Sequence, residues 1–144
     1  MSYHDIPEIK RPIVCVSGGF DILHKGHVDM IEHAATYGSV VVILNSDEWL
    51  IRKKGYNMLD WDHRCRILGA IKGVVGVSKV NDRDDTVCEA LKRINPDYFA
   101  NGGDRKLGNT PELELCKKLG IEPIFGIGGE KSASSSEIVN AIRV

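Results

Sequence analysis

Two histidines, His24 and His27, lie three residues apart in the glycine-rich stretch 18–27, which follows the short apolar run 13–16. This pattern predicts a strand that turns directly into a helix, with both imidazoles at the turn. In a parallel α/β sheet such a turn lies at the carboxyl end of the strand, where ligands bind. A helix N-terminus there offers backbone N–H groups and a positive dipole end to an anion. Two imidazoles beside an anion site indicate phosphate-transfer chemistry.

The two histidines also have simpler interpretations, as helix caps or as half of a metal site. Zinc normally takes three or four protein ligands, and no third His or Cys stands nearby in the sequence. His27 falls in the predicted first helical turn, where the helix dipole disfavours imidazolium and favours a neutral N–H donor. We therefore expect phosphate binding, with the adjacent glycines allowing the backbone to approach the ligand.

Polar residues follow two other predicted strands. Residues 45–47, Asn-Ser-Asp, come directly after the buried run 40–44, and residues 101–105, Asn-Gly-Gly-Asp-Arg, follow the run 97–100. The carboxyl ends of parallel strands meet at one edge of a sheet, so these segments should lie near the histidines. For residues 45–47 the plainer interpretation is a capped turn into a helix around 48–51. The paired glycines after the other strand indicate a close approach of the backbone.

Cationic side chains stand between these segments. Lys53 and Lys54 end a basic run, which is usually a solvated face. Beside a phosphate, however, a lysine supplies mobile positive charge to a leaving pyrophosphate. For Arg64 the plainer interpretation is a surface arginine paired with Asp60 or Asp62.

A further anion site is predicted near the end of the chain. Ser134 and Glu137 have the spacing of a capping box, which predicts the start of a last helix over about 135–142. Because a capped helix N-terminus is also an anion site, the hydroxyls of Ser134, Ser135 and Ser136 could contact phosphate as well.

The elements that must position these residues are short apolar runs alternating with longer amphipathic segments. Strands are predicted at 13–16, 40–44, 74–77, 97–100 and 123–127. Helices are predicted between them, beginning near Val28 and after the N-cap Thr110, and ending at Gly38, before Pro96 and at Gly120. This alternation implies parallel pairing with right-handed crossovers, and therefore a three-layer α/β/α sandwich.

Composition narrows the function classes further. The 144 residues suit one domain, and we expect an N-terminal arm over 1–12 and a single domain over 13–144. The formal net charge of −1 gives no reason to expect a nucleic-acid partner. No apolar run approaches the roughly 18 residues of a membrane helix, and no signal peptide is expected. The four cysteines are widely spaced, which favours reduced thiols in the cytoplasm over disulfides or a zinc site.

The string Phe20-Asp21-x-x-His24-x-Gly26-His27 resembles the signature of the cytidylyltransferase-like nucleotidyltransferases, and further matching segments follow in the same order over nearly the whole chain. The resemblance implies a Rossmann-like open parallel sheet of five strands in the order 3-2-1-4-5. It also implies that the two histidines hold the triphosphate of CTP or ATP, that Mg²⁺ is the cofactor, and that the protein is a homodimer.

The same resemblance implies a role for each remaining candidate. Arg64 would make a forked contact with phosphate, and either Lys53 or Lys54 would neutralise charge; we place Lys54 with the catalytic residues. Asp47 and Arg105 are expected on the acceptor side. Nucleotide-binding residues are expected at Gly19, Phe20, Asp21, Gly26, Lys53, Gly103, Asp104, Ser134, Ser135 and Ser136. For Asp21 the alternative is a structural role, in which its carboxylate accepts hydrogen bonds from backbone N–H groups.

The implied reaction is attack of an acceptor phosphate on the α-phosphorus of a nucleoside triphosphate, with release of pyrophosphate. The favoured substrates are CTP and a small phosphorylated polyol or sugar such as glycerol 3-phosphate. One alternative is ATP with a heptose-type sugar 1-phosphate, which the segment 102–104 favours. The other is a nucleotide-binding module without turnover. Glycerol-phosphate cytidylyltransferases carry an arginine before the serine triplet where this chain has Gly129, which argues against transferring their choice of nucleotide.

Overall fold

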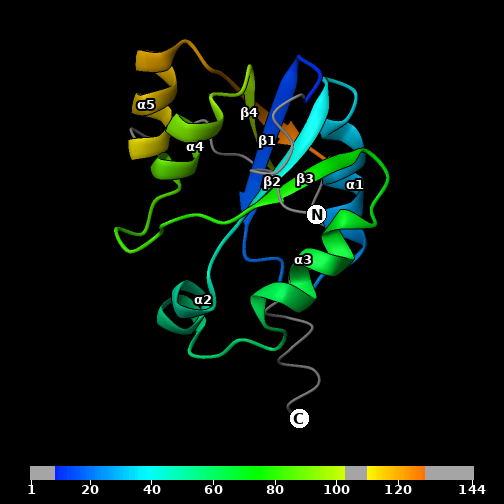
Figure 1. The fold of residues 1–144 in the computed structure, drawn as a ribbon, viewed down its shortest axis with the longest axis vertical. Helices are drawn as coiled ribbons and strands as arrows, with labels where there is room; N and C mark the ends of the chain where they lie inside the picture. Colours follow the sequence, from blue (N-terminus) through cyan, green and yellow to red (C-terminus); the bar gives the residue numbers. More distant parts are fainter. Residues whose placement is uncertain (1–8, 103–109, 129–144) are drawn as a thin grey trace.

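The computed structural model describes residues 9–102 and 110–128. Its centre is a five-stranded sheet with the strand order β3-β2-β1-β4-β5, in which every neighbouring pair is parallel (Figure 1). The strands are β1 (Ile13–Gly18), β2 (Ser39–Leu44), β3 (Val74–Ser78), β4 (Tyr98–Gly102) and β5 (Glu122–Ile127). The order implied by the family resemblance is thus confirmed, and each predicted strand is present within one or two residues of its expected limits.

Helices cover both faces of the sheet, which confirms the three-layer sandwich (Figure 1). Side chains of β1 alternate between two apolar clusters: Val14 and Val16 belong to one, Cys15 to the other. The first cluster includes residues of α1 (Lys25–Ala34) and α3 (Trp61–Gly69), and the second includes residues of α4 (Cys88–Ile94) and α5 (Pro111–Leu119). The remaining helix, α2 (Asp47–Lys54), lies beyond the carboxyl ends of the strands.

The continuous apolar run of β2 follows from this double coverage. Residues 40–44 are fully buried, because they pair with β1 and β3 along the edges and meet helices on both faces. Strands buried on both faces read as unbroken β-branched runs rather than as alternating patterns. The central strands therefore form a rigid base from which the loops at the carboxyl edge project.

Three predicted helix limits illustrate what local sequence can and cannot specify. Helix α5 has its expected caps: the Thr110 Oγ accepts a hydrogen bond from Leu113 N at 3.2 Å, and Gly120 ends the helix with φ +75°. The prediction for Gly38 was wrong, because α1 ends at Ala34. A Cβ at Gly38 would lie 2.3 Å from the Pro12 carbonyl oxygen, so this glycine permits a close backbone approach instead.

The described part of the N-terminal arm, residues 9–12, is irregular in backbone but packed on the domain. Ile9 packs against the α4/α5 cluster, and Arg11 forms an ion pair with Asp97 at 3.0 Å. The Lys10 carbonyl accepts a hydrogen bond from the Ser39 hydroxyl at 2.8 Å. The predicted helix over 135–142 lies outside the described residues.

All four cysteines are free thiols, and Cys15 and Cys116 are buried in the α4/α5 cluster. Burial raises the pKa of Cys116 to about 11 and raises that of Cys15 even further above its ordinary value. Both thiols therefore stay protonated at neutral pH in the folded protein, and neither is suited to act as a nucleophile.

This burial predicts a loss of stability in alkali. Above pH 9 the unfolded chain releases the Cys116 proton, whereas the folded protein keeps it up to about pH 11, so the unfolded state binds fewer protons and stability falls as pH rises. We expect the decline of Tm between pH 9 and 11 to be shallower in Cys116→Ala than in the parent chain, whatever the starting Tm. Parallel declines of the two proteins, measured by scanning fluorimetry, would contradict the assignment.

Candidate active site

The histidine pair forms the N-terminus of α1, at the carboxyl end of β1. His24 is the N-cap residue, and its Nδ1 accepts a hydrogen bond from Gly26 N at 3.0 Å. His27, in the first turn, accepts one at its own Nδ1 from His24 N at 3.2 Å. The two rings stack with centroids 4.0 Å apart. Helix α1 therefore begins at Lys25, three residues earlier than the apolar spacing predicts, because the histidines themselves cap it.

This capping decides which ring nitrogen carries the proton. In a neutral imidazole one nitrogen donates and the other accepts. Because Nδ1 of both His24 and His27 accepts a backbone N–H, each neutral ring must carry its proton on Nε2. The cap interpretation of these residues is thus confirmed, and it is compatible with phosphate binding because the two roles use opposite ring nitrogens.

The neighbouring residues Gly19 and Phe20 support this arrangement from inside the protein. Phe20 is only 4% exposed and meets the His27 ring edge-on, with centroids 5.0 Å apart. A Cβ at Gly19 would lie 2.5 Å from the Leu50 Cδ2 of α2, so the glycine accommodates that helix. Both residues therefore have packing roles in the structure. The sequence instead suggested that the glycine allows the backbone to approach a ligand.

Asp21 holds a second loop of the site in place. The side chain is 1% exposed, and its two oxygens accept hydrogen bonds from the backbone N–H groups of Met58 and Leu59 at 2.6 and 3.0 Å. The structure therefore supports the alternative in which the Asp21 carboxylate accepts hydrogen bonds from backbone N–H groups. Its carboxylate thereby connects the segment before α3 to the loop 19–24, which joins β1 to α1 and is called the histidine loop below.

The structure separates the two lysines that the sequence left equivalent. Lys54 Nζ lies 3.5 Å from the Asp21 carbonyl oxygen, so its side chain is directed toward the histidine loop. Lys53 Nζ lies 3.9 Å from an Asp85 carboxylate oxygen, in the loop before α4. Only Lys54 is thus oriented toward the two histidines.

Arg64 corrects both sequence interpretations. Its side chain is fully buried rather than at the surface. Its Nε donates to Leu59 O, its Nη1 to Gly19 O and Asn45 O, and its Nη2 to Asp47 Oδ1, at distances of 2.6–2.9 Å. A forked contact with phosphate needs two N–H groups on one edge of the guanidinium, and four of its five are already donated to protein oxygens. Arg64 is a positioning residue that joins the loops after β1 and β2 to the segment before α3.

Asp82, which the sequence analysis did not single out, extends this framework. It is 3% exposed and accepts hydrogen bonds from Asn45 Nδ2, Ser46 N and Ser46 Oγ at 2.7–3.0 Å. Ser46 in turn caps α2 by accepting from Trp49 N at 3.0 Å, so the capped turn predicted at residues 45–47 is confirmed. Asp82 follows β3, and its place after a predicted strand was the available signal.

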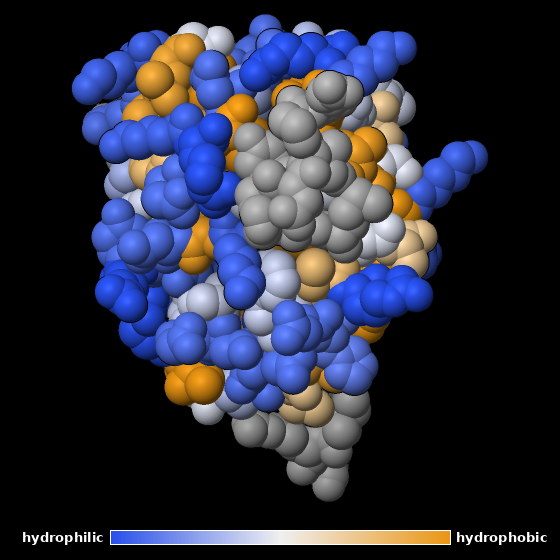
Figure 2. Space-filling view, viewed as in Figure 1, coloured by the Kyte–Doolittle hydropathy of each residue, from blue (hydrophilic) through white to orange (hydrophobic). Residues whose placement is uncertain are grey.

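A polar groove of about 610 Å³ borders Ser46 and Asp82. It lies on the strongly hydrophilic side of the molecule formed by α2 and the segment before α4 (Figure 2). Two of the arginines that line it bind protein groups: Arg52 donates to the Asp82 carbonyl and to Asp85, and Arg93 donates to Glu89. The side chains of Arg52 and Arg93 connect α2 and α4 to the residues that follow β3.

Several predicted site residues lie outside the described residues, namely Gly103, Asp104, Arg105, Ser134, Ser135 and Ser136. Within the described ranges, no group of three or more His, Cys, Asp or Glu side chains could hold a metal ion. The buried carboxylate of Asp21 accepts backbone hydrogen bonds at both oxygens. The Asp21 carboxylate is thus already engaged by the protein backbone.

Comparison with known proteins places this geometry in a family. The family model described as cytidylyltransferase-like matches residues 15–140. The chain belongs to the cytidylyltransferase-like family. It is accordingly a nucleotidyltransferase, as the histidine motif predicted, and the segments that form the site all fall within the matched range.

Two relatives of this cytidylyltransferase-like chain show what it resembles. It is 34% identical over 116 residues to the D-beta-D-heptose 1-phosphate adenylyltransferase of Bordetella bronchiseptica, a match that covers 78% of this chain and 70% of that protein. It is 35% identical over 144 residues to the bifunctional protein HldE of Vibrio parahaemolyticus, covering 91% of this chain but only 28% of that protein.

A solved structure agrees with the sequence matches. The lipopolysaccharide core biosynthesis protein from Thermoplasma volcanium superposes with a TM-score of 0.66 at 26% identity, covering 83% of this chain and 98% of that chain. The chain therefore shares its fold with a solved structure over most of the length of both proteins.

Proposed function

We propose that the protein transfers the adenylyl group of ATP to a heptose-type sugar 1-phosphate and releases pyrophosphate. The observation that carries the transfer chemistry is the stacked pair of His24 and His27, whose Nδ1 atoms both accept backbone hydrogen bonds. The choice of nucleotide and acceptor is supported by the Bordetella bronchiseptica relative, which is named for that activity.

In this mechanism an oxygen of the acceptor phosphate attacks the α-phosphorus of ATP. A new P–O bond forms, the bond between the α-phosphorus and the bridging oxygen breaks, and its electron pair leaves with pyrophosphate. No protein nucleophile is needed, so the protein acts by positioning and by stabilising charge. Nε2–H groups of His24 and His27 donate to the phosphate oxygens. The ammonium group of Lys54 neutralises the negative charge that develops on the leaving pyrophosphate. Mg²⁺ enters as part of the substrate, bound to the triphosphate.

CTP with glycerol 3-phosphate, which the sequence favoured, has less support. The relatives described above include a named adenylyltransferase, and glycerol 3-phosphate is not part of any of their names. A nucleotide-binding module without turnover is disfavoured by the intact and fully oriented histidine pair.

The deciding experiment is an assay of pyrophosphate release with Mg²⁺. ATP, CTP, GTP and UTP are each combined with heptose 1-phosphate, hexose 1-phosphates and glycerol 3-phosphate. We expect the highest kcat/KM for ATP with heptose 1-phosphate. A preference for CTP with glycerol 3-phosphate would replace the proposal with the sequence-based one, and nucleotide binding without turnover would favour the non-catalytic module.

The two lysines give a matched pair of variants. Lys54→Ala should lower kcat by about 10²-fold, because its positive charge is aimed at the histidine loop where charge develops. Lys53→Ala should change kcat by less than about 3-fold, because Lys53 pairs with Asp85 at an exposed position. Steady-state kinetics of both variants with saturating ATP check this, and equal losses would overturn the assignment of Lys54.

We also propose a homodimer, on the strength of the family resemblance, and a cytoplasmic location, on the strength of the four free cysteines. Within residues 9–102 and 110–128, no helix is both long and apolar enough to cross a membrane. Sedimentation equilibrium of the purified chain tests the dimer directly, and a monomer at micromolar concentration would exclude it.

A further inference from the structure

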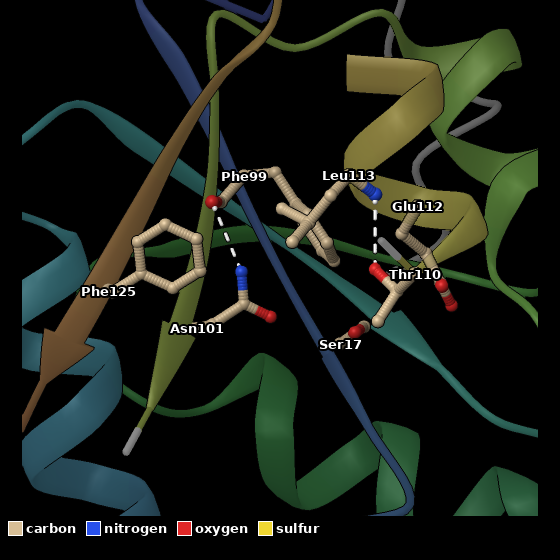
Figure 3. Close-up of a pocket in the computed structure, with 7 residues that line it drawn as sticks. All are labelled: Ser17, Phe99, Asn101, Thr110, Glu112, Leu113 and Phe125. Atoms are coloured by element: carbon tan, nitrogen blue, oxygen red, sulfur yellow. Dashed lines mark hydrogen bonds between the residues drawn. The ribbon is translucent and has the colours of Figure 1, made fainter. Parts of the chain in front are cut away.

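A small cavity opens at the carboxyl edge of the sheet, on the face opposite α1. Its walls are Ser17 at the end of β1, Asn101 at the end of β4, Phe125 of β5, and the first turn of α5 with its N-cap (Figure 3). The sheet reverses its direction of growth between β1 and β4, because β2 and β3 lie on one side of β1 and β4 and β5 on the other. Ligands of open α/β sheets bind at this switch point.

The chemistry of the walls is that of a site for neutral hydroxyl groups. Ser17 supplies a hydroxyl, Asn101 a carboxamide and Glu112 a carboxylate, while Phe99 and Phe125 supply apolar ring surface. The carboxamide nitrogen of Asn101 already donates to Phe99 O at 3.5 Å, and one Glu112 oxygen accepts from Val87 N at 3.2 Å. These bonds fix both side chains while each retains a further polar atom for a ligand.

The charge of the described residues that line the cavity disfavours phosphate. Among the described residues that line it there is no lysine, arginine or histidine, and the one charged group is the Glu112 carboxylate. A phosphate would be repelled by that carboxylate, whereas a sugar hydroxyl can donate to it. The volume of about 60 Å³ accommodates a few water-sized groups.

We propose that this cavity binds the hydroxylated arm of the acceptor sugar that lies furthest from its phosphate. This inference rests on the proposed function, since it assumes that the acceptor is a sugar 1-phosphate. The phosphate end then lies toward the histidine loop, which follows β1 directly, and the neutral end enters the cavity beside Ser17 and Asn101. Selection for a heptose over a shorter sugar would come from hydroxyls that fill these hydrogen-bonding positions.

The test compares heptose 1-phosphate with a hexose 1-phosphate of the same ring configuration that lacks the outer hydroxymethyl group. Asn101→Leu preserves side-chain size but removes the polar atoms. We expect kcat/KM for the heptose substrate to fall by about 10- to 100-fold, and that for the hexose substrate by less than about 3-fold. Glu112→Gln, which can still accept the Val87 N–H, should lower kcat/KM for the heptose substrate by about 5-fold. Glu114→Gln, an exposed change on the same helix, is the control.

The inference would be overturned by no preference of the parent chain for the heptose, by equal losses with both acceptors, or by unchanged kinetics in Asn101→Leu and Glu112→Gln. A change in either variant in the ratio of activities with ATP and 2′-deoxy-ATP would also overturn it, because the cavity would then hold the ribose.

If the parent chain turns over no sugar phosphate, the proposed function fails separately. Calorimetric binding of heptose 1-phosphate then tests whether the cavity binds the sugar. About 10-fold weaker binding by Asn101→Leu supports this role, and no binding by the parent chain overturns it.

Discussion

Arg64→Met is expected to lower the free energy of unfolding by about 3–5 kcal/mol, because it removes a fully buried guanidinium that donates to four protein oxygens. The variant leaves the carbonyl oxygens of Gly19, Asn45 and Leu59 without their donor, and it leaves Asp47 without its cation. An unpaired buried polar group costs far more than the net value of the hydrogen bond that it lost. Urea denaturation monitored by tryptophan fluorescence measures the difference.

The matched control is Arg66→Met, two residues further along α3. Arg66 is exposed, so its replacement should change stability by no more than about 0.5 kcal/mol. Arg64→Lys should fall between the two, because one ammonium keeps the charge but cannot reach four acceptors in the geometry of a guanidinium. An Arg64→Met variant as stable as the parent chain, but with a selectively raised KM for ATP, would restore the phosphate contact implied by the family resemblance.

The contrast between Arg64 and the strands shows which features a sequence specifies. The run 40–44 must be a buried strand, because an unbroken β-branched stretch of that length has few other ways to leave water. The Thr110 and Gly120 caps are equally local, since their hydrogen bonds join residues within one helix turn. The order of the strands is not local, and it was predicted only because the histidine motif resembles a family with a known order.

The residues that sequence reasoning misjudged are those whose partners are distant in the chain. Arg64 bonds to Gly19, 45 residues away, and Asp82 bonds to Ser46, 36 residues away. Nothing near Arg64 in the sequence distinguishes an arginine that binds phosphate from one that binds three loops. Gly19 is similar, because a glycine required by a neighbouring helix looks the same as one required by a ligand.

His27→Ala is expected to lower kcat by about 10²- to 10³-fold. This is the usual effect of removing one preorganised hydrogen-bond donor to an oxygen on which negative charge develops. The structure makes a sharper test possible, because the ring has two separate functions. Its Nδ1 accepts from His24 N and so stabilises the start of α1, whereas its Nε2–H is the proposed donor to phosphate. Alanine removes both, so it should also reduce stability by about 1 kcal/mol through the lost cap.

Two further substitutions separate these functions, since the amide atoms of Asn and Gln occupy different positions of the imidazole ring. His27→Asn places an acceptor near the Nδ1 position, so it should recover stability while kcat stays as low as in His27→Ala. His27→Gln places an N–H near the Nε2 position, so it should recover part of kcat without recovering the cap. Single-turnover rates and thermal unfolding of all three variants check this, with the exposed His63→Ala as control. If kcat followed stability across the three variants, His27 would act through the helix cap alone, and the donor role at the α-phosphate would have to be abandoned.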